Sequence, residues 1–159
     1  MRSLIFAISS LFFLTACHQT DVPETNIQEP SSAIVVNKNS LQDGTFCFSK
    51  FYNKDVTDVQ LTILGSAVTG KMDWVPYQKD SARGTLKGNK NAAGEMDLMY
   101  DYMIEGNQQT ETKVMKIEDA KLLIKVGELL DPKNDGNLVF KDVSQAKYTE
   151  VLEKVDCKS

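Results

Sequence analysis

From Gly44 onwards, hydrophobic and polar residues alternate with a period of two, and turn residues interrupt the pattern at short intervals. This alternation predicts half-buried β-strands, because successive side chains of a strand point to opposite faces. The clearest case is the stretch 95–104, in which every second residue from Met96 to Ile104 is large and apolar. The predicted strands cover residues 45–52, 59–63, 68–74, 84–88, 95–104, 110–117, 121–126 and 138–140.

The last segment, residues 144–157, allows two interpretations. Its apolar residues fit helical spacing, whereas a closing strand would bring Cys157 beside Cys47; we favour the strand. About eight short strands with few helical signals predict an all-β domain over residues 44–159. The expected architecture is an antiparallel meander that forms a small closed barrel or a curled sandwich, and closure would remove exposed strand edges.

The N-terminal segment has the pattern of an export signal. Arg2 precedes an apolar run over residues 4–14, which is too short to span a bilayer as a helix. The run ends in Leu14-Thr15-Ala16-Cys17, which resembles the bacterial lipobox, a leucine and two small residues before a cysteine that is lipidated. We therefore expect a lipoprotein signal peptide over residues 1–16 and lipid attachment at Cys17; the alternative is an ordinary signal peptide with a chance cysteine.

Lipidation would make the protein membrane-anchored through diacylglycerol and N-acyl (palmitate) chains on Cys17, since two or more chains give stable attachment. Residues 17–43 are rich in Pro, Ser, Thr, Gln and Asn, which is typical of a flexible tether, although the apolar cluster at residues 33–36 could form an edge strand. His18 follows the cysteine in place of the aspartate that retains lipoproteins at the inner membrane. The expected location is therefore the bacterial cell envelope, at the outer membrane.

Charge and cysteine content limit the possible partners. The chain has a formal net charge of −4, and loss of Arg2 with the signal peptide makes it more acidic. An acidic domain argues against a nucleic-acid partner, which requires a basic face. Apart from Cys17 there are two cysteines, Cys47 and Cys157, and in an oxidising envelope this pair predicts a disulfide. The alternative is two free buried thiols.

Catalytic chemistry finds little support in the sequence. The only histidine, His18, lies in the tether, which argues against a Ser-His-Asp or Cys-His site and against histidine-based zinc binding. Glu95, Asp97 and Asp101 share one strand face at a spacing that a carboxylate-dependent glycan enzyme could use. A solvated sheet face shows the same pattern, and we favour that interpretation. We expect no catalytic residues, no metal and no cofactor.

Two further features could bind a ligand. Residues 131–136 partly match a calcium-binding loop, but Pro132 and Lys133 disrupt the pattern and favour a plain turn. Aromatic residues on or near the predicted strands could line an apolar pocket in the mouth of a barrel, although strand aromatics more often belong to the core. The candidate pocket residues are Trp74, Tyr77, Tyr100 and Tyr102.

Several short motifs recur in a fixed order along residues 44–157. They are Cys47 with neighbouring aromatics, Val68-Thr69-Gly70, Lys79-Asp80, Gly84-Thr85, an aromatic strand from Tyr100 that ends in Glu105-Gly106, and Cys157. In this order they resemble a family of small uncharacterised bacterial lipoproteins. Arg83 departs from the more neutral residue expected before Gly84-Thr85. The resemblance implies the architecture and tight packing at the glycines, but no reaction, substrate or partner.

The sequence therefore predicts a non-enzymatic envelope lipoprotein whose β domain binds a protein or a small ligand. One alternative is an inhibitor or protective factor against a cell-wall hydrolase, for which a protruding loop at residues 79–84 would be the signature. The other alternative is the carboxylate-dependent glycan enzyme.

Overall fold

The structure is a computed structural model, and it describes residues 42–158. This part of the chain contains strands, turns and bends and no helix. The predicted signal peptide, the lipid-attachment residue Cys17 and nearly all of the predicted tether lie outside the described residues. The strands are β1 (Gly44–Tyr52), β2 (Asp55–Leu64), β3 (Ala67–Val75), β4 (Ala82–Lys90), β5 (Glu95–Ile104), β6 (Asn107–Glu118), β7 (Lys121–Val126), β8 (Leu129–Leu130), β9 (Asn137–Phe140) and β10 (Lys147–Val155).

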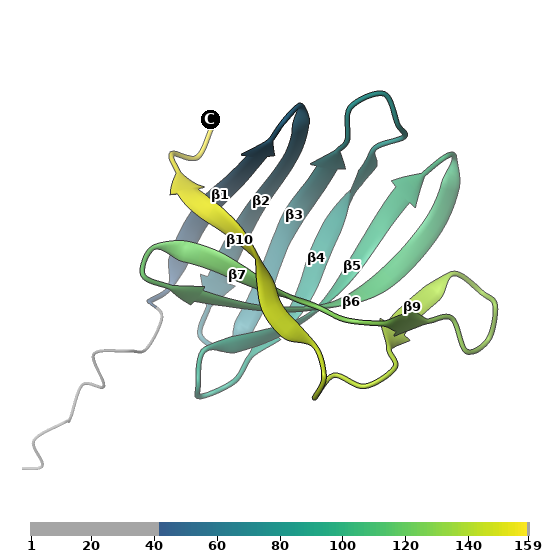
Figure 1. Ribbon diagram of the computed structural model, residues 1–159. Coiled ribbons are helices and arrows are strands. Elements are labelled where there is room, and N and C mark those ends of the chain that lie inside the picture. Colours follow the sequence, from purple (N-terminus) through teal and green to yellow (C-terminus); the bar gives the residue numbers. More distant parts are fainter. Residues whose placement is uncertain (1–41, 159) are drawn as a thin grey trace, which may run out of the picture. The chain divides into compact units, whose positions relative to one another are not determined.

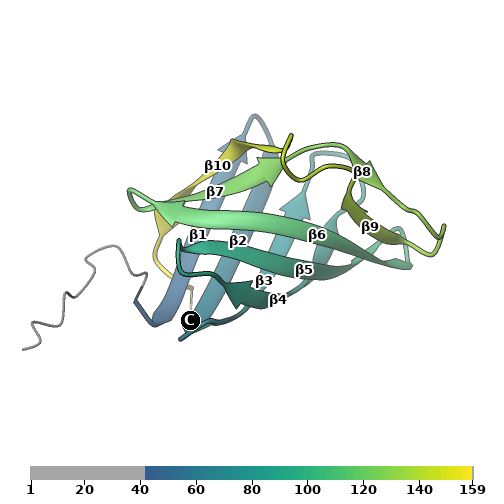
Figure 2. The same ribbon diagram turned by 90° about the horizontal axis from the view of Figure 1, so that it is seen from below.

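Eight of these strands close into an antiparallel barrel (Figures 1 and 2). Strands β1 to β7 pair in sequence order, and β10 fits between β7 and β1 to complete the circle. The all-β fold class is confirmed, and of the two expected forms the barrel is the one observed. The final segment is a strand, as favoured, because β10 supplies the missing partner for both β7 and β1.

Strands β8 and β9 are an addition to the barrel that the sequence pattern only partly indicates. They pair with each other antiparallel, while β9 runs parallel to β6 at Thr110 and Glu111. The second half of β6, from Met115 to Glu118, pairs with β7 instead. On one side, β6 therefore pairs with β9 along its first half and with β7 along its second half. Strand β9, which lies between β7 and β10 in the sequence, covers the part of β6 that β7 leaves unpaired.

The barrel core follows from the alternation of residues along each strand. In β5 the side chains of Met96, Leu98, Tyr100 and Tyr102 are buried, while Glu95, Asp97, Met99, Asp101 and Met103 face outwards. The same alternation in the neighbouring strands fills the interior with large apolar groups. Fully buried side chains include Phe48, Leu61, Ile63, Val68, Leu86, Met115, Leu122, Ile124 and Leu152.

Two glycines of β4 allow β5 to approach it closely. A Cβ atom on Gly84 would lie 2.0 Å from the carbonyl oxygen of Asp101, and one on Gly88 would lie 1.9 Å from that of Asp97. Real Cβ atoms do not tolerate such contacts with backbone, so both positions require glycine. Because glycine has no side chain, Gly84 and Gly88 at these inward positions permit the strong curvature that a small barrel needs.

The seam between β1 and β10 is short and is reinforced by a disulfide. Only three residue pairs join the two strands, from Cys47 opposite Val155 to Ser49 opposite Glu153. Cys47 and Cys157 form the predicted disulfide, with their Cα atoms 5.2 Å apart. Beyond Ser49, β1 pairs only with β2. Strands β1 and β10 are therefore joined near the start of β1 and are no longer paired towards its end.

The barrel has two different ends. We call the end that carries the β1–β2, β3–β4 and β5–β6 hairpins the open end; these hairpins lie along the upper edge in Figure 1. The opposite end, which we call the entry end, carries Gly44 at the start of β1 and the β2–β3, β4–β5 and β6–β7 turns.

No helix among residues 42–158 is long and apolar enough to cross a membrane.

Candidate functional site

A cavity of about 300 Å³ occupies the interior of the barrel at its open end. Strands β3, β4, β5, β6 and β10 all contribute inward side chains to it. We call this space the lumen cavity. Its lining consists of Met72, Trp74, Ala82, Tyr100, Tyr102, Ile104, Glu111, Lys113 and Glu150. The cavity therefore has an aromatic and aliphatic wall on β3 to β5 and a charged wall on β6 and β10.

The charged wall contains an ion pair that faces inwards. Glu111 lies opposite Tyr100 and Lys113 lies opposite Leu98 in the β5–β6 ladder, so both share the inward face of β6. Lys113 Nζ donates to Glu111 Oε1 over 2.6 Å, and each side chain keeps 15% of its area exposed. Charges at such a position require partners, because burial of an unpaired charge is costly. The pair is shielded by the barrel wall but remains reachable from the open end.

The aromatic wall is held rigidly by hydrogen bonds. The rings of Tyr100 and Tyr102 stack with centroids 4.5 Å apart and an interplanar angle of 13°. The Tyr100 hydroxyl donates to the carbonyl oxygen of Met72, and the Tyr102 hydroxyl donates to Gln109 Oε1, each over 2.9 Å. Burial raises the pKa of both tyrosines, and the nearby Glu111 carboxylate adds to the increase. Both rings therefore present neutral faces to the cavity over the physiological pH range.

The mouth of the cavity includes the only tryptophan of the chain and a second charged pair. Trp74 lies near the end of β3 and is 38% exposed. Glu150 enters the cavity from β10, and its Oε1 lies 3.6 Å from Lys50 Nζ of β1. This pair bridges the open end of the seam, where the two strands no longer pair. The mouth thus combines an aromatic surface with a carboxylate.

Of the four predicted pocket residues, the structure brings three together. Trp74, Tyr100 and Tyr102 all line the lumen cavity, whereas Tyr77 lies in the β3–β4 loop and is half exposed. The backbone N–H of Tyr77 donates to Asp55 Oδ1 over 2.7 Å, and Lys54 Nζ lies 4.1 Å from the centre of the Tyr77 ring. Tyr77 therefore belongs to the outer rim of the open end and not to the cavity.

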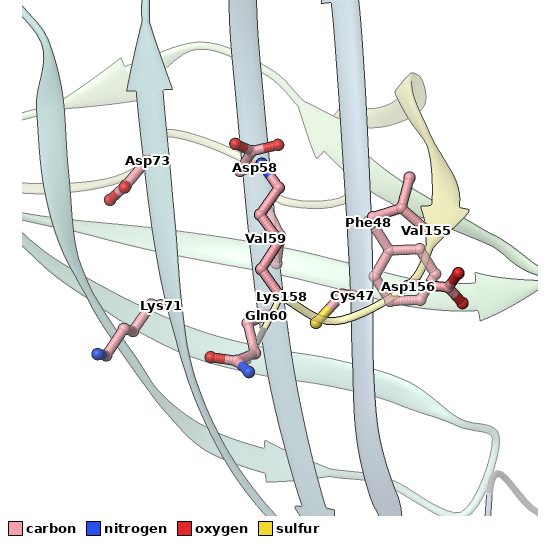
Figure 3. A pocket seen from close by; sticks show the side chains of 10 residues that line it. All are labelled: Cys47, Phe48, Asp58, Val59, Gln60, Lys71, Asp73, Val155, Asp156 and Lys158. Atoms are coloured by element: carbon pink, nitrogen blue, oxygen red, sulfur yellow. The ribbon is translucent and has the colours of Figure 1, made fainter.

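A second, smaller cavity of about 190 Å³ lies beside the disulfide (Figure 3). Residues 155–158 run from the end of β10 past β1 to β2, and the Lys158 side chain extends along β2 towards Asp58. Its polar lining includes Asp73 and Lys71, which lie on β3 opposite Asp58 and Gln60. This space is a gap between the C-terminal segment and the barrel wall. Its charged lining consists of Asp58, Asp73, Asp156, Lys71 and Lys158.

The carboxylates that the sequence offered for glycan chemistry lie outside the barrel. Asp97 and Asp101 are exposed on β5, as expected for a solvated face, and Glu95 shares their face but is partly buried. The Tyr148 hydroxyl donates to Glu95 Oε2 over 2.5 Å, and Lys125 Nζ lies 2.9 Å from the same oxygen. The hydrogen bond from Tyr148 and the contact with Lys125 lower the pKa of Glu95. Glu95 thus fastens β5 to β7 and β10.

The loop after β8 is a carboxylate-capped turn. Asp131 accepts backbone hydrogen bonds from Gly136 and Asp135, which lowers its pKa. Both carboxylate oxygens of Asp131 therefore accept hydrogen bonds within the loop. No group of three or more His, Cys, Asp or Glu side chains that could hold a metal ion occurs among residues 42–158.

Sequence reasoning missed the charged wall of the lumen cavity. Glu111, Lys113 and Glu150 interrupt the rule that inward positions are apolar, so pattern alone assigns them to the solvent face. The available signal was the phase of β6, because Glu111 and Lys113 are spaced by two from Met115 and Ile117. In a barrel strand, polar residues in phase with apolar ones indicate a wet or ligand-binding interior.

Comparison of the chain with protein-family models, curated proteins and solved structures finds no significant match.

Proposed function

We propose that the protein is a lipid-anchored bacterial envelope lipoprotein whose barrel is a non-enzymatic binding domain for a small ligand. The observation that carries this proposal is the lumen cavity, which combines a rigid aromatic wall with an inward ion pair. Small-molecule sites typically pair apolar and aromatic surface with a few well-placed polar groups, and about 300 Å³ is the lower limit of their usual size. The open end of a barrel is also a common place for such sites.

The position of the cavity suits a tethered protein. The first strand begins at Gly44 at the entry end, whereas the lumen cavity opens at the other end. A tether over residues 17–43 would therefore join the barrel at the end opposite the mouth of the cavity. The lipid anchor is supported by the lipobox sequence, by the composition of the tether and by the resemblance to small bacterial lipoproteins. His18 after the cysteine supports a location at the outer membrane.

A binding assay can use Trp74 as a built-in reporter, because it is the only tryptophan and lines the cavity. The full-length protein in detergent would be titrated with size-fractionated small molecules extracted from the envelope of its host. We expect at least one fraction to change the Trp74 emission saturably. Intact-mass analysis of the same preparation tests the acylation of Cys17.

A matched pair of substitutions separates lumen binding from surface effects. Ala82→Leu would fill part of the cavity, since Ala82 lines it and is buried. Ala92→Leu makes the same change at an exposed position in the β4–β5 turn at the entry end. Ala82→Leu should abolish the response and Ala92→Leu should keep it, with circular dichroism confirming that both fold. A response unchanged by Ala82→Leu, or no response to any fraction, would contradict the proposal.

A second candidate, an inhibitor or protective factor that binds a cell-wall hydrolase, is favoured by the outer rim of the open end. Phe51 and Tyr52 at the tip of the β1–β2 hairpin are 72% and 65% exposed, and Tyr77 is held beside that hairpin by Asp55. Exposed, rigid aromatic residues are typical of protein interfaces. The expected loop signature is shorter than residues 79–84, because Ala82 to Gly84 already belong to β4. Inhibition assays with Phe51→Ser against cell-wall hydrolases test this candidate.

A further inference from the structure

We infer that the lumen cavity binds a free α-amino acid with an apolar side chain, as a zwitterion whose two charges pair with Glu111 and Lys113. This inference rests on the proposed function, because it names the class of ligand for the same cavity.

The ion pair on β6 has unused bonding capacity. A lysine ammonium has three donors and a carboxylate has two acceptor oxygens, and the contact of 2.6 Å uses one Lys113 donor and Glu111 Oε1. Both side chains keep part of their surface exposed within the cavity. Each member of the pair can therefore accept a second partner of opposite charge without giving up the first.

A ligand with a single charge fits the Glu111–Lys113 pair poorly, and Glu150, the third charge of the wall, already has Lys50 as its partner. An organic cation would pair with Glu111 but would lie against the Lys113 ammonium, and an organic anion would have the reverse conflict. Charges removed from water require a complete set of partners, and a half-satisfied set is unfavourable. A zwitterion completes a four-charge array in which every positive group lies between two negative groups.

The spacing of the charges selects an α-amino acid among zwitterions. Its ammonium nitrogen and the nearer carboxylate oxygen are joined by three bonds, N–Cα, Cα–C and C–O, and lie about 3 Å apart. That separation is close to the 2.6 Å between Lys113 Nζ and Glu111 Oε1, so the two dipoles can lie antiparallel, side by side. A flexible zwitterion with a long chain between its charges must fold back on itself to form this array, which costs conformational entropy that an α-amino acid does not lose.

The rest of the cavity suits an apolar side chain. Met72, Ala82 and Ile104 provide aliphatic surface, and the stacked Tyr100 and Tyr102 rings provide a flat wall. Both tyrosine hydroxyl hydrogens are directed at protein acceptors, so these residues do not offer their donor to a polar side chain. Selectivity should therefore favour leucine-like over charged side chains.

The test compares four related ligands with the full-length protein in detergent, using Trp74 emission and calorimetry. Leucine is the zwitterion, 3-methylbutan-1-amine lacks its carboxylate, 4-methylpentanoate lacks its ammonium, and 6-aminohexanoate separates the two charges. We expect leucine to bind at least about tenfold more tightly than each of the others, since each charged hydrogen bond contributes about that factor or more. Equal binding of the amine or the acid, or no leucine binding, would overturn the inference.

Charge substitutions provide a second, reciprocal test. Glu111→Gln should weaken leucine binding about tenfold or more and strengthen binding of 4-methylpentanoate, because Lys113 then lacks its carboxylate partner. Lys113→Gln should weaken leucine and strengthen the amine. The matched control is the Lys116–Glu118 pair, which has the same spacing on β6 and the same contact of 2.6 Å but is more exposed. Glu118→Gln should leave all four affinities unchanged.

The outcomes distinguish this inference from the proposed function. If Glu111→Gln or Lys113→Gln fails to fold, the comparison of the four ligands on the unmodified protein still decides the inference. If leucine does not bind but an envelope fraction shifts Trp74 emission and Ala82→Leu prevents the shift, the amino acid is wrong and the binding function stands. Loss of the Trp74 response to every fraction would contradict the binding function itself.

Discussion

Reduction of the Cys47–Cys157 disulfide should strongly lower the stability of the barrel. Cys47 and Cys157 are separated by 110 positions in the sequence, so the bond closes nearly the whole domain into one loop. The chain-entropy model gives about 4.8 kcal/mol for a loop of this length at 25 °C, and measured losses for native disulfides are usually about 2–5 kcal/mol. Total stabilities of domains are about 5–15 kcal/mol, so the reduced barrel should be marginal.

The structure adds a local reason to expect a value in the upper half of that range. Only three residue pairs join β1 to β10, and the disulfide lies at this seam. The reduced chain must hold the seam with these pairs and the partly exposed contact between Lys50 and Glu150. Exposed ion pairs contribute little. We therefore expect a loss of about 3–5 kcal/mol.

Urea unfolding followed by Trp74 emission measures this loss. With a slope of about 2 kcal/mol per M, the midpoint should fall by about 1.5–2.5 M when a phosphine reductant is added. The Cys47→Ser/Cys157→Ser variant should have the lower midpoint already and should not respond to the reductant. A midpoint that changes by less than about 0.3 M, which corresponds to roughly 0.6 kcal/mol, would refute the reasoning about seam and loop.

Three further predictions concern packing and titration. Gly84→Ala and Gly88→Ala should each lower the free energy of unfolding, measured in urea, by about 3 kcal/mol or more, because the added Cβ would meet the backbone of β5. The control Thr85→Ala, on the exposed face between them, should lower it by less than about 1 kcal/mol. Burial raises the pKa values of Tyr100, Tyr102 and Tyr148 above the ordinary value of 10.0. Their contribution to stability is therefore complete below about pH 10 and is lost as the pH rises through the folded values. Phenolate absorbance of the folded protein should show these three tyrosines titrating above about pH 10, and formation of their phenolates at or below that pH would contradict this. The pKa of Glu95 is lowered from 4.5, so its contribution to stability is present above that pH and is lost as the pH falls through the folded value. Glu95→Gln should therefore make the free energy of unfolding fall less steeply as the pH is lowered. An unchanged dependence on acidic pH would argue against the Tyr148 and Lys125 contacts.

The strands that the sequence predicts best are those whose two faces differ most. Residues 95–104 alternate without exception between large apolar groups and outward residues, so both the extent and the phase of β5 were predictable. Strand β2 is longer than expected because Asp55 and Val56 continue the ladder to the hairpin. Strand β8 has two residues and no pattern, and the parallel pairing of β9 with β6 depends on contacts between segments far apart in sequence. Local patterning carries no information on such contacts.

The candidate site was predictable in its aromatic half and not in its charged half. Trp74, Tyr100 and Tyr102 lie in phase with core residues of their strands, which places them inside any closed barrel. Tyr77 has no strand phase, and its position is decided by Asp55 on a different hairpin. Glu111 and Lys113 are inward because of the register of β6, and their burial is possible only because they pair with each other.

The most direct test of the lumen cavity as the binding site uses methyl NMR of methionine-labelled full-length protein. Met72 lines the cavity, whereas Met99 and Met103 are exposed on the outward face of β5. Addition of a saturating small ligand should shift the methyl signal of Met72 and leave those of Met99 and Met103 in place. Shifts confined to the two outer methionines would show that the ligand binds the barrel wall and would contradict a binding site in the lumen.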